Sequence, residues 1–203
     1  MSLAVKTPAP VSTEAPRVSM YRFSVKQYHR MIANGVLRED DRVELLDGWI
    51  VSKMTHNPPH DTAVDLAQTE IALVLPQRWR VRVQSAITLA TSEPEPDVAV
   101  VRGPARRYAR VHPRPKDIAL LVEVADTSLL EDRLIKGRLY ARARIPFYWI
   151  INLIESIVEV YAEPKGGKSP TYAKRRDFGS KDSVPVVIEE REIAEIAVRT
   201  LLP

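Results

Sequence analysis

The sequence has no cysteine and no long apolar run. Without cysteine it has no disulfide scaffold, no thiolate zinc site and no cysteine nucleophile, and we expect a reducing, cytoplasmic setting. No apolar stretch approaches the roughly 20 residues that a membrane-spanning helix needs, so we expect no membrane partner. The N-terminal residues lack the apolar segment of a secretory signal, and we expect none.

The composition is that of a globular protein of ordinary domain size. The chain has 203 residues, of which 45% are apolar and 28% charged, enough for one buried core. Residues 1–18 are rich in proline, serine, threonine and alanine, which predicts a disordered arm before a single domain at 19–203. The net charge of +4 permits a polyanionic partner without establishing one.

Local patterns predict helices and strands in alternation. Ser24 is a good N-cap for a helix that ends near Asn34-Gly35. Asp47-Gly48 predicts a hairpin of strands at 42–46 and 49–54. The remaining expected elements are a helix at 59–75, one or two strands within 79–90, strands at 97–101 and 118–124, a helix at 128–143, strands at 147–153 and 156–162, a polar loop or loose hairpin at 163–183, a strand at 184–188, and a strand or helical turn at 192–198.

This order predicts an α/β fold of the α+β kind, a central mixed β-sheet flanked by helices. Two carboxylates interrupt its apolar strands. Glu123 lies inside IALLVEV, and Asp97 directly precedes VAVV. A carboxylate in such a place must be paired, protonated or bound to a metal. Two of them on neighbouring strands predict a site for Mg²⁺ or Mn²⁺, which prefer oxygen ligands.

A lysine is expected to face the same place. Projecting the helix at 128–143 at about 100° per residue gives an apolar face with Asp132 and Lys136 in its middle. The rest of that face is Leu129, Ile135, Leu139, Tyr140 and Ala143, and the residues outside it are Arg133, Arg138, Arg142 and Arg144. Lys136 is therefore predicted to point at the sheet, with Asp132 supporting it along the helix.

Together these three groups suit metal-assisted hydrolysis of a phosphodiester. Asp97 and Glu123 would hold the cation, which activates water. Lys136 would neutralise charge that develops on the phosphate. Two structural interpretations compete with this hypothesis. Asp97 caps a turn, or Glu123 and Lys136 form a buried ion pair that only specifies packing.

The residues also resemble a known family. Pro96-Asp97 and Val122-Glu123-Val124 resemble the core of the PD-(D/E)XK nuclease superfamily, and the chain is similar over roughly 20–203 to the Uma2 family, also called DUF820. The similar segments are VELLDGWIVSKM, the following Pro-Pro-His60, EPDVAVV, LLVEVADTSLLEDRLIKGRLYARARIPFYWIINL and IAVRTLLP. The resemblance implies a restriction-endonuclease-like core, a DNA substrate and a homodimer.

It also implies roles for individual residues. The helix lysine of Uma2-like chains matches Lys136, because Ala125 occupies the usual lysine position on the strand. A glutamate near the opening hairpin matches Glu44, and a histidine at the start of the second helix matches His60. Gln84 is a further candidate. As alternatives, Glu44 is a solvated hairpin residue and His60 a satisfied core histidine.

Two positions depart from the family pattern. Arg144 replaces a glycine that would end the helix, and Phe147 replaces a glutamate. The leading hypothesis remains a Mg²⁺-dependent endonuclease acting on DNA. One alternative is a catalytically silent nuclease-fold module that binds nucleic acid or a protein, and another is a structural homodimer. Basic residues between 102 and 116 and between 165 and 181 either contact phosphates or are solvated.

Overall fold

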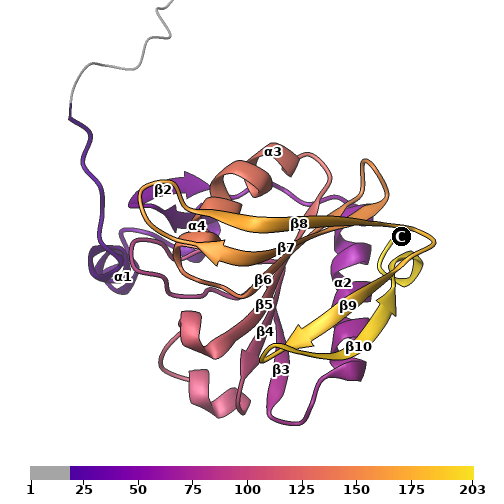
Figure 1. Ribbon diagram of the computed structural model, residues 1–203. Coiled ribbons are helices and arrows are strands. Elements are labelled where there is room, and N and C mark those ends of the chain that lie inside the picture. The colour runs from indigo at the N-terminus through magenta and orange to yellow at the C-terminus, as the bar shows by residue number, and fades with distance from the viewer. Residues whose placement is uncertain (1–18) are drawn as a thin grey trace, which may run out of the picture.

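The computed structural model describes residues 19–203, so the arm predicted at 1–18 lies outside the described residues. A six-stranded mixed sheet with the order β3-β4-β5-β6-β7-β8 runs through the centre (Figure 1). Its β5–β6 pair is parallel, and the other neighbours are antiparallel. The strands are β3 (Trp79–Val83), β4 (Val98–Arg102), β5 (Ile118–Ala125), β6 (Phe147–Asn152), β7 (Ile157–Lys165) and β8 (Thr171–Gly179). The predicted mixed sheet is confirmed.

Two small hairpins accompany this sheet. In the first, β1 (Val43–Leu46) and β2 (Trp49–Ser52) are joined at Asp47-Gly48, as predicted. Both turn residues have positive φ, 48° and 84°, a conformation that Asp-Gly adopts readily. The second hairpin, β9 (Ser183–Ile188) and β10 (Arg191–Ala197), shows that the last predicted element is a strand rather than a helical turn.

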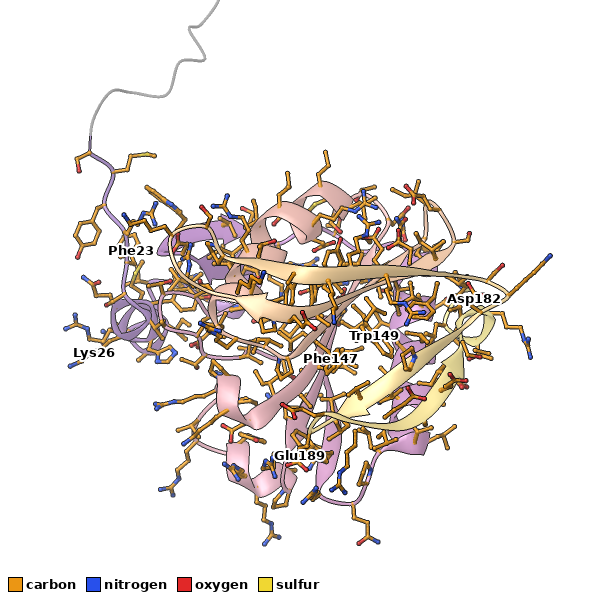
Figure 2. The ribbon with its side chains drawn as sticks, viewed as in Figure 1. Phe23, Lys26, Phe147, Trp149, Asp182 and Glu189 are labelled. Atoms are coloured by element: carbon orange, nitrogen blue, oxygen red, sulfur yellow. The ribbon has the colours of Figure 1, made fainter. Side chains whose placement is uncertain are left out.

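Helices cover the sheet on both faces. α1 (Val25–Ala33) begins at a capping box of Ser24 and Gln27. α2 (Pro58–Val74) and the β9–β10 hairpin pack on one face, where Trp149, labelled in Figure 2, is buried. The opposite face packs against Leu139 and Tyr140 of the later helix. Short 3₁₀ turns lie at Glu39–Asp41, Ala105–Tyr108, Pro115–Asp117 and Val198–Thr200.

The helix predicted at 128–143 is interrupted by a π-helical segment. It consists of α3 (Leu129–Glu131), the π segment η4 (Asp132–Lys136) and α4 (Gly137–Arg142). A π turn inserts an extra residue, so the regular projection no longer places the side chains correctly. Ile135, predicted on the buried face, is 48% exposed. Arg133, predicted outside that face, contacts Glu159 on β7.

The structure also decides two predictions that the sequence had left open. The segment 163–183, predicted as a loop or loose hairpin, contains the end of β7 and the whole of β8, which pair in antiparallel register. The strand predicted within 79–90 ends at Val83, because Gln84 takes a positive φ of 42° that breaks the extended backbone. Among residues 19–203, no helix combines the length and apolarity that crossing a membrane requires.

Candidate active site

Asp97 and Glu123 lie beside each other across the β4–β5 pair. Val98 of β4 is opposite Val122 of β5, which brings the residues next to them together. The backbone N–H of Asp97 points to Glu123 Oε2 at 3.4 Å, and the N–H of Val124 donates to Asp97 Oδ2 at 2.8 Å. The two carboxylic residues are 7% and 2% exposed. Asp97 accepts a hydrogen bond from the next strand and is thus held there as part of the sheet.

Lys136 reaches this pair from the π segment. Its Nζ lies 3.0 Å from Glu123 Oε2 and 3.8 Å from Asp132 Oδ1, and its side chain is 13% exposed. Tyr140, one turn further along, donates its hydroxyl to Glu123 Oε1 at 2.6 Å. Glu123 therefore has a cation on one oxygen and a hydrogen-bond donor on the other. The sequence had assigned Tyr140 only to the apolar face of the helix.

Glu44 faces the same pocket from β1. It is 5% exposed, so the alternative of a solvated hairpin residue is wrong. Its Oε2 accepts a hydrogen bond at 3.0 Å from the backbone N–H of Glu95, and Glu95 forms an ion pair with Lys53. Both partners of that ion pair line the pocket, together with Asp126 and Glu131.

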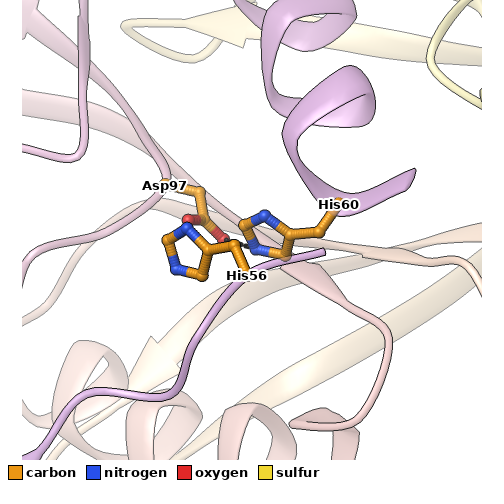
Figure 3. A group of neighbouring side chains, drawn as sticks. All are labelled: His56, His60 and Asp97. Atoms are coloured by element: carbon orange, nitrogen blue, oxygen red, sulfur yellow. Dashed lines mark ion pairs between the residues drawn. The ribbon is translucent and has the colours of Figure 1, made fainter. Parts of the chain in front are cut away.

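His60 approaches Asp97 from the first turn of α2. Asn57 caps this helix and accepts a hydrogen bond from the His60 backbone N–H at 3.1 Å, which fixes the histidine over the sheet. His60 Nε2 lies 3.2 Å from Asp97 Oδ2. The ring of His56 stacks on that of His60 with centroids 4.2 Å apart, and Gln84 Nε2 lies 3.1 Å from His56 Nδ1. Figure 3 shows both imidazoles directed at the Asp97 carboxylate.

All of the predicted site residues line this one pocket. They are Glu44, His60, Gln84, Asp97, Glu123 and Lys136. Sequence reasoning missed His56, Glu95 and Tyr140. A signal existed for two of them, since His56 lies four residues before His60 and Glu95 lies two before Asp97.

Comparison with protein families gives a match over most of the chain. The family model described as "Uma2: Putative restriction endonuclease" matches residues 25–197. The chain belongs to the Uma2 family. A solved structure described as a putative nuclease belonging to DUF820, from Anabaena variabilis ATCC 29413, is similar with a TM-score of 0.60 and 19% identity. The similarity covers 83% of this chain and 94% of that one, and it supports the fold. No curated protein matches the chain.

The pocket of this Uma2 chain carries an excess of negative charge. Seven carboxylic residues and two lysines line it. Burial raises the pKa of Glu123 well above its usual range, although Lys136 opposes the shift. Burial likewise raises the pKa of Asp132 to about 6. Lys136 alone does not compensate these buried acids, so a further cation would be favoured here.

Lys136 and Asp97 keep their charges. Burial would lower the pKa of Lys136, but the charges of Glu123 and Glu44 raise it above its usual value, so the ammonium stays protonated. Burial would raise the pKa of Asp97, but hydrogen bonding from His60 lowers it overall. The same contact raises the pKa of His60 despite the opposing effect of burial. Asp97 is thus ionised near neutral pH.

The two departures from the family pattern lie away from the pocket. Arg144 follows α4 and keeps the left-handed conformation, with a φ of 60°, that suits glycine at a helix end. Phe147 opens β6 and packs at the edge of the core. Neither residue lines the pocket that holds Asp97, Glu123 and Lys136.

Proposed function

We propose that this protein is an endonuclease that hydrolyses phosphodiester bonds of DNA with Mg²⁺ or Mn²⁺ bound at Asp97 and Glu123. The observation that carries the proposal is the approach of three groups in one pocket. The buried residues Asp97 and Glu123 meet across neighbouring strands, where the backbone N–H of Asp97 lies 3.4 Å from Glu123 Oε2, and the Lys136 ammonium lies 3.0 Å from the same oxygen. Membership of a family whose model is described as "Putative restriction endonuclease" supports DNA as the substrate.

The donor set fits a hard divalent cation. Asp97 and Glu123 offer carboxylate oxygens, the ligands that Mg²⁺ prefers. Burial raises the pKa of Glu123, so burial disfavours its ionised form, and a divalent cation would supply charge that stabilises that form. When bound, Mg²⁺ polarises a phosphodiester and lowers the pKa of a coordinated water.

The chain's own residues provide position and charge. Lys136 holds a permanent positive charge beside Glu123, where it would stabilise negative charge developing on a phosphate. Tyr140 fixes the Glu123 carboxylate through a 2.6 Å hydrogen bond. His60 lies 3.2 Å from Asp97 and would hold that carboxylate in position. Glu44, which is held by the Glu95 backbone N–H, would orient an attacking water.

A plasmid-nicking assay with Mg²⁺, Mn²⁺ or EDTA tests this function. Wild-type protein should nick plasmid with either cation and not with EDTA. Asp97→Asn and Lys136→Met should each reduce the rate by about 100-fold or more, the effect of removing one transition-state contact. The matched control is Lys26→Met, an exposed lysine on α1 labelled in Figure 2, which should retain the wild-type rate.

Two outcomes would contradict the proposal. Nicking that persists in EDTA or in Asp97→Asn would assign the activity to something other than this pocket. Salt-sensitive retention of DNA without cleavage in any cation would favour the catalytically silent module instead. The resemblance also implies a homodimer, which light scattering on the purified protein tests separately.

A further inference from the structure

The pocket holds a second group of metal-binding side chains beside the carboxylate pair. His56, His60 and Asp97 each offer one ligand atom, and these atoms all lie within 4.8 Å of one another. We propose that these three residues form a separate site for a borderline transition-metal ion such as Zn²⁺. The site adjoins the proposed Mg²⁺ site and shares Asp97 with it.

The separations are close to those of ligands on one ion. Nitrogen and oxygen ligands lie about 2.0–2.2 Å from Zn²⁺, which places neighbouring ligands about 3–3.5 Å apart. His60 Nε2 and Asp97 Oδ2 are already 3.2 Å apart. His56 lies in the connection between β2 and α2 and is partly exposed, so a modest movement of its ring completes the set. Figure 3 shows a ring nitrogen of each histidine facing the carboxylate.

The surroundings of His60 fit a metal-bound imidazole. A histidine that binds a metal through one ring nitrogen usually donates its other N–H to a carboxylate. His60 Nδ1 lies 3.5 Å from Asp61 Oδ1, and within residues 19–203 it is a buried atom without a hydrogen-bond partner. A ligand on Nε2 would leave Nδ1 as the protonated nitrogen and Asp61 as its acceptor.

The donor types distinguish this site from the Mg²⁺ site. Two imidazoles and one carboxylate are ligands for zinc and similar ions, whereas Mg²⁺ prefers oxygen. A carboxylate has two oxygens with about four lone-pair positions, so Asp97 can serve both sites. The other two histidines, His29 and His112, lie near Glu93, and their ring centroids are 6.5 Å apart. The ligand atoms of these three residues do not all lie within 4.8 Å of one another.

Calorimetric titration of the EDTA-treated full chain with ZnCl₂ and with MgCl₂ tests the proposal without nucleic acid. Wild-type protein should bind Zn²⁺, and His56→Gln should weaken that binding at least tenfold while Mg²⁺ affinity stays within twofold. His60→Gln should weaken Zn²⁺ binding similarly. His112→Gln is the matched control and should bind Zn²⁺ within twofold of wild type.

Specific titration results would contradict the proposed Zn²⁺ site. Zn²⁺ affinity that is unchanged in His56→Gln, or lowered equally in His112→Gln, would overturn the site and leave His60 as the ion-pair partner of Asp97. Glu123→Gln separates this proposal from the proposed function. It should weaken Mg²⁺ binding and leave Zn²⁺ binding within threefold. A chain that binds Zn²⁺ at the histidines but no Mg²⁺ would refute the Mg²⁺ site alone.

Discussion

Two buried glutamates in the same sheet have opposite surroundings. Glu123 on β5 is opposite Ile150 on β6, which in turn is opposite Glu159 on β7, so the two glutamates belong to one row and one face. They are 2% and 0% exposed. The same helix supplies a cation to each, Lys136 to Glu123 and Arg133 to Glu159.

The difference lies in how completely each carboxylate is satisfied. Glu159 accepts from Arg133 Nε at 3.1 Å, Asn152 Nδ2 at 3.0 Å and the Tyr161 hydroxyl at 2.7 Å, with Arg175 3.4 Å away. Burial would raise the pKa of Glu159, but these contacts lower it overall. For Glu123 burial prevails and the pKa rises. Glu159 thus has more partners than Glu123, and of the two glutamates only Glu123 lines the pocket.

The largest expected effect is on cleavage. Glu123→Gln should lower the plasmid-nicking rate by about 100-fold or more, because it removes a proposed cation ligand. Glu159→Gln should change the rate of the folded protein by less than about fivefold. Equal losses of rate in the two variants, measured on protein shown to be folded by circular dichroism, would contradict the proposed difference between Glu123 and Glu159.

The loss of stability should follow the reverse order, larger for Glu159→Gln than for Glu123→Gln. Glu159→Gln leaves Arg133 facing a neutral amide, and removing one partner of a buried pair costs about 3–5 kcal/mol. Because Arg133 is partly exposed, we expect a loss of about 2–3 kcal/mol. Glu123→Gln should cost less, because burial already disfavours the ionised form of Glu123 and because Asp132 remains beside Lys136. The urea midpoint of each variant checks this order, and a larger loss for Glu123→Gln would contradict it.

The pH dependence of stability should show that the fold stabilises the charged form of Glu159. Its pKa is lowered from an ordinary value of 4.5. Its contribution is therefore complete above about pH 4.5 and is lost as the pH falls through the lower value of the folded state, because the unfolded chain binds the proton first. The difference in free energy of unfolding between wild type and Glu159→Gln should shrink from pH 6 to pH 3. A difference that grows on acidification would show that folding raises the pKa of Glu159 instead of lowering it.

The smallest effect on stability should come from replacing Arg175, the more exposed of the two arginines beside Glu159. Arg175 is exposed at the edge of the sheet, and its shorter contact is with Asp177 at 2.7 Å. Arg175→Met should cost less than about 1 kcal/mol, as exposed ion pairs do. Arg133→Met should cost more, since Arg133 makes the closer contacts to Glu159. Urea unfolding of the two variants side by side measures the ratio.

Local signals explain which elements were predictable. The Ser24 cap and the Asp47-Gly48 turn act through a few neighbouring residues, so the sequence alone predicts them. β8 was predicted only as part of a loop or loose hairpin, because it is an edge strand whose residues are mostly exposed, which leaves no apolar alternation to detect.

The site was partly predictable for a similar reason. A carboxylate within an apolar strand singled out Glu123, and the same rule applied to the strand at 156–162 would have found Glu159. The rule detects burial but not the partners, which come from distant segments. Arg133 was assigned to the wrong face because the π segment shifts the helix. His56 lies outside any periodic element, so only its spacing from His60 pointed to it.

The most direct test of the proposed cation site at Asp97 and Glu123 is anomalous diffraction from crystals soaked in Mn²⁺. We expect an anomalous peak in contact with the carboxylates of both Asp97 and Glu123, and no peak at Glu159. Crystals that show no peak at the Asp97 and Glu123 carboxylates, or that place manganese at Glu159 instead, would contradict the proposed nuclease centre.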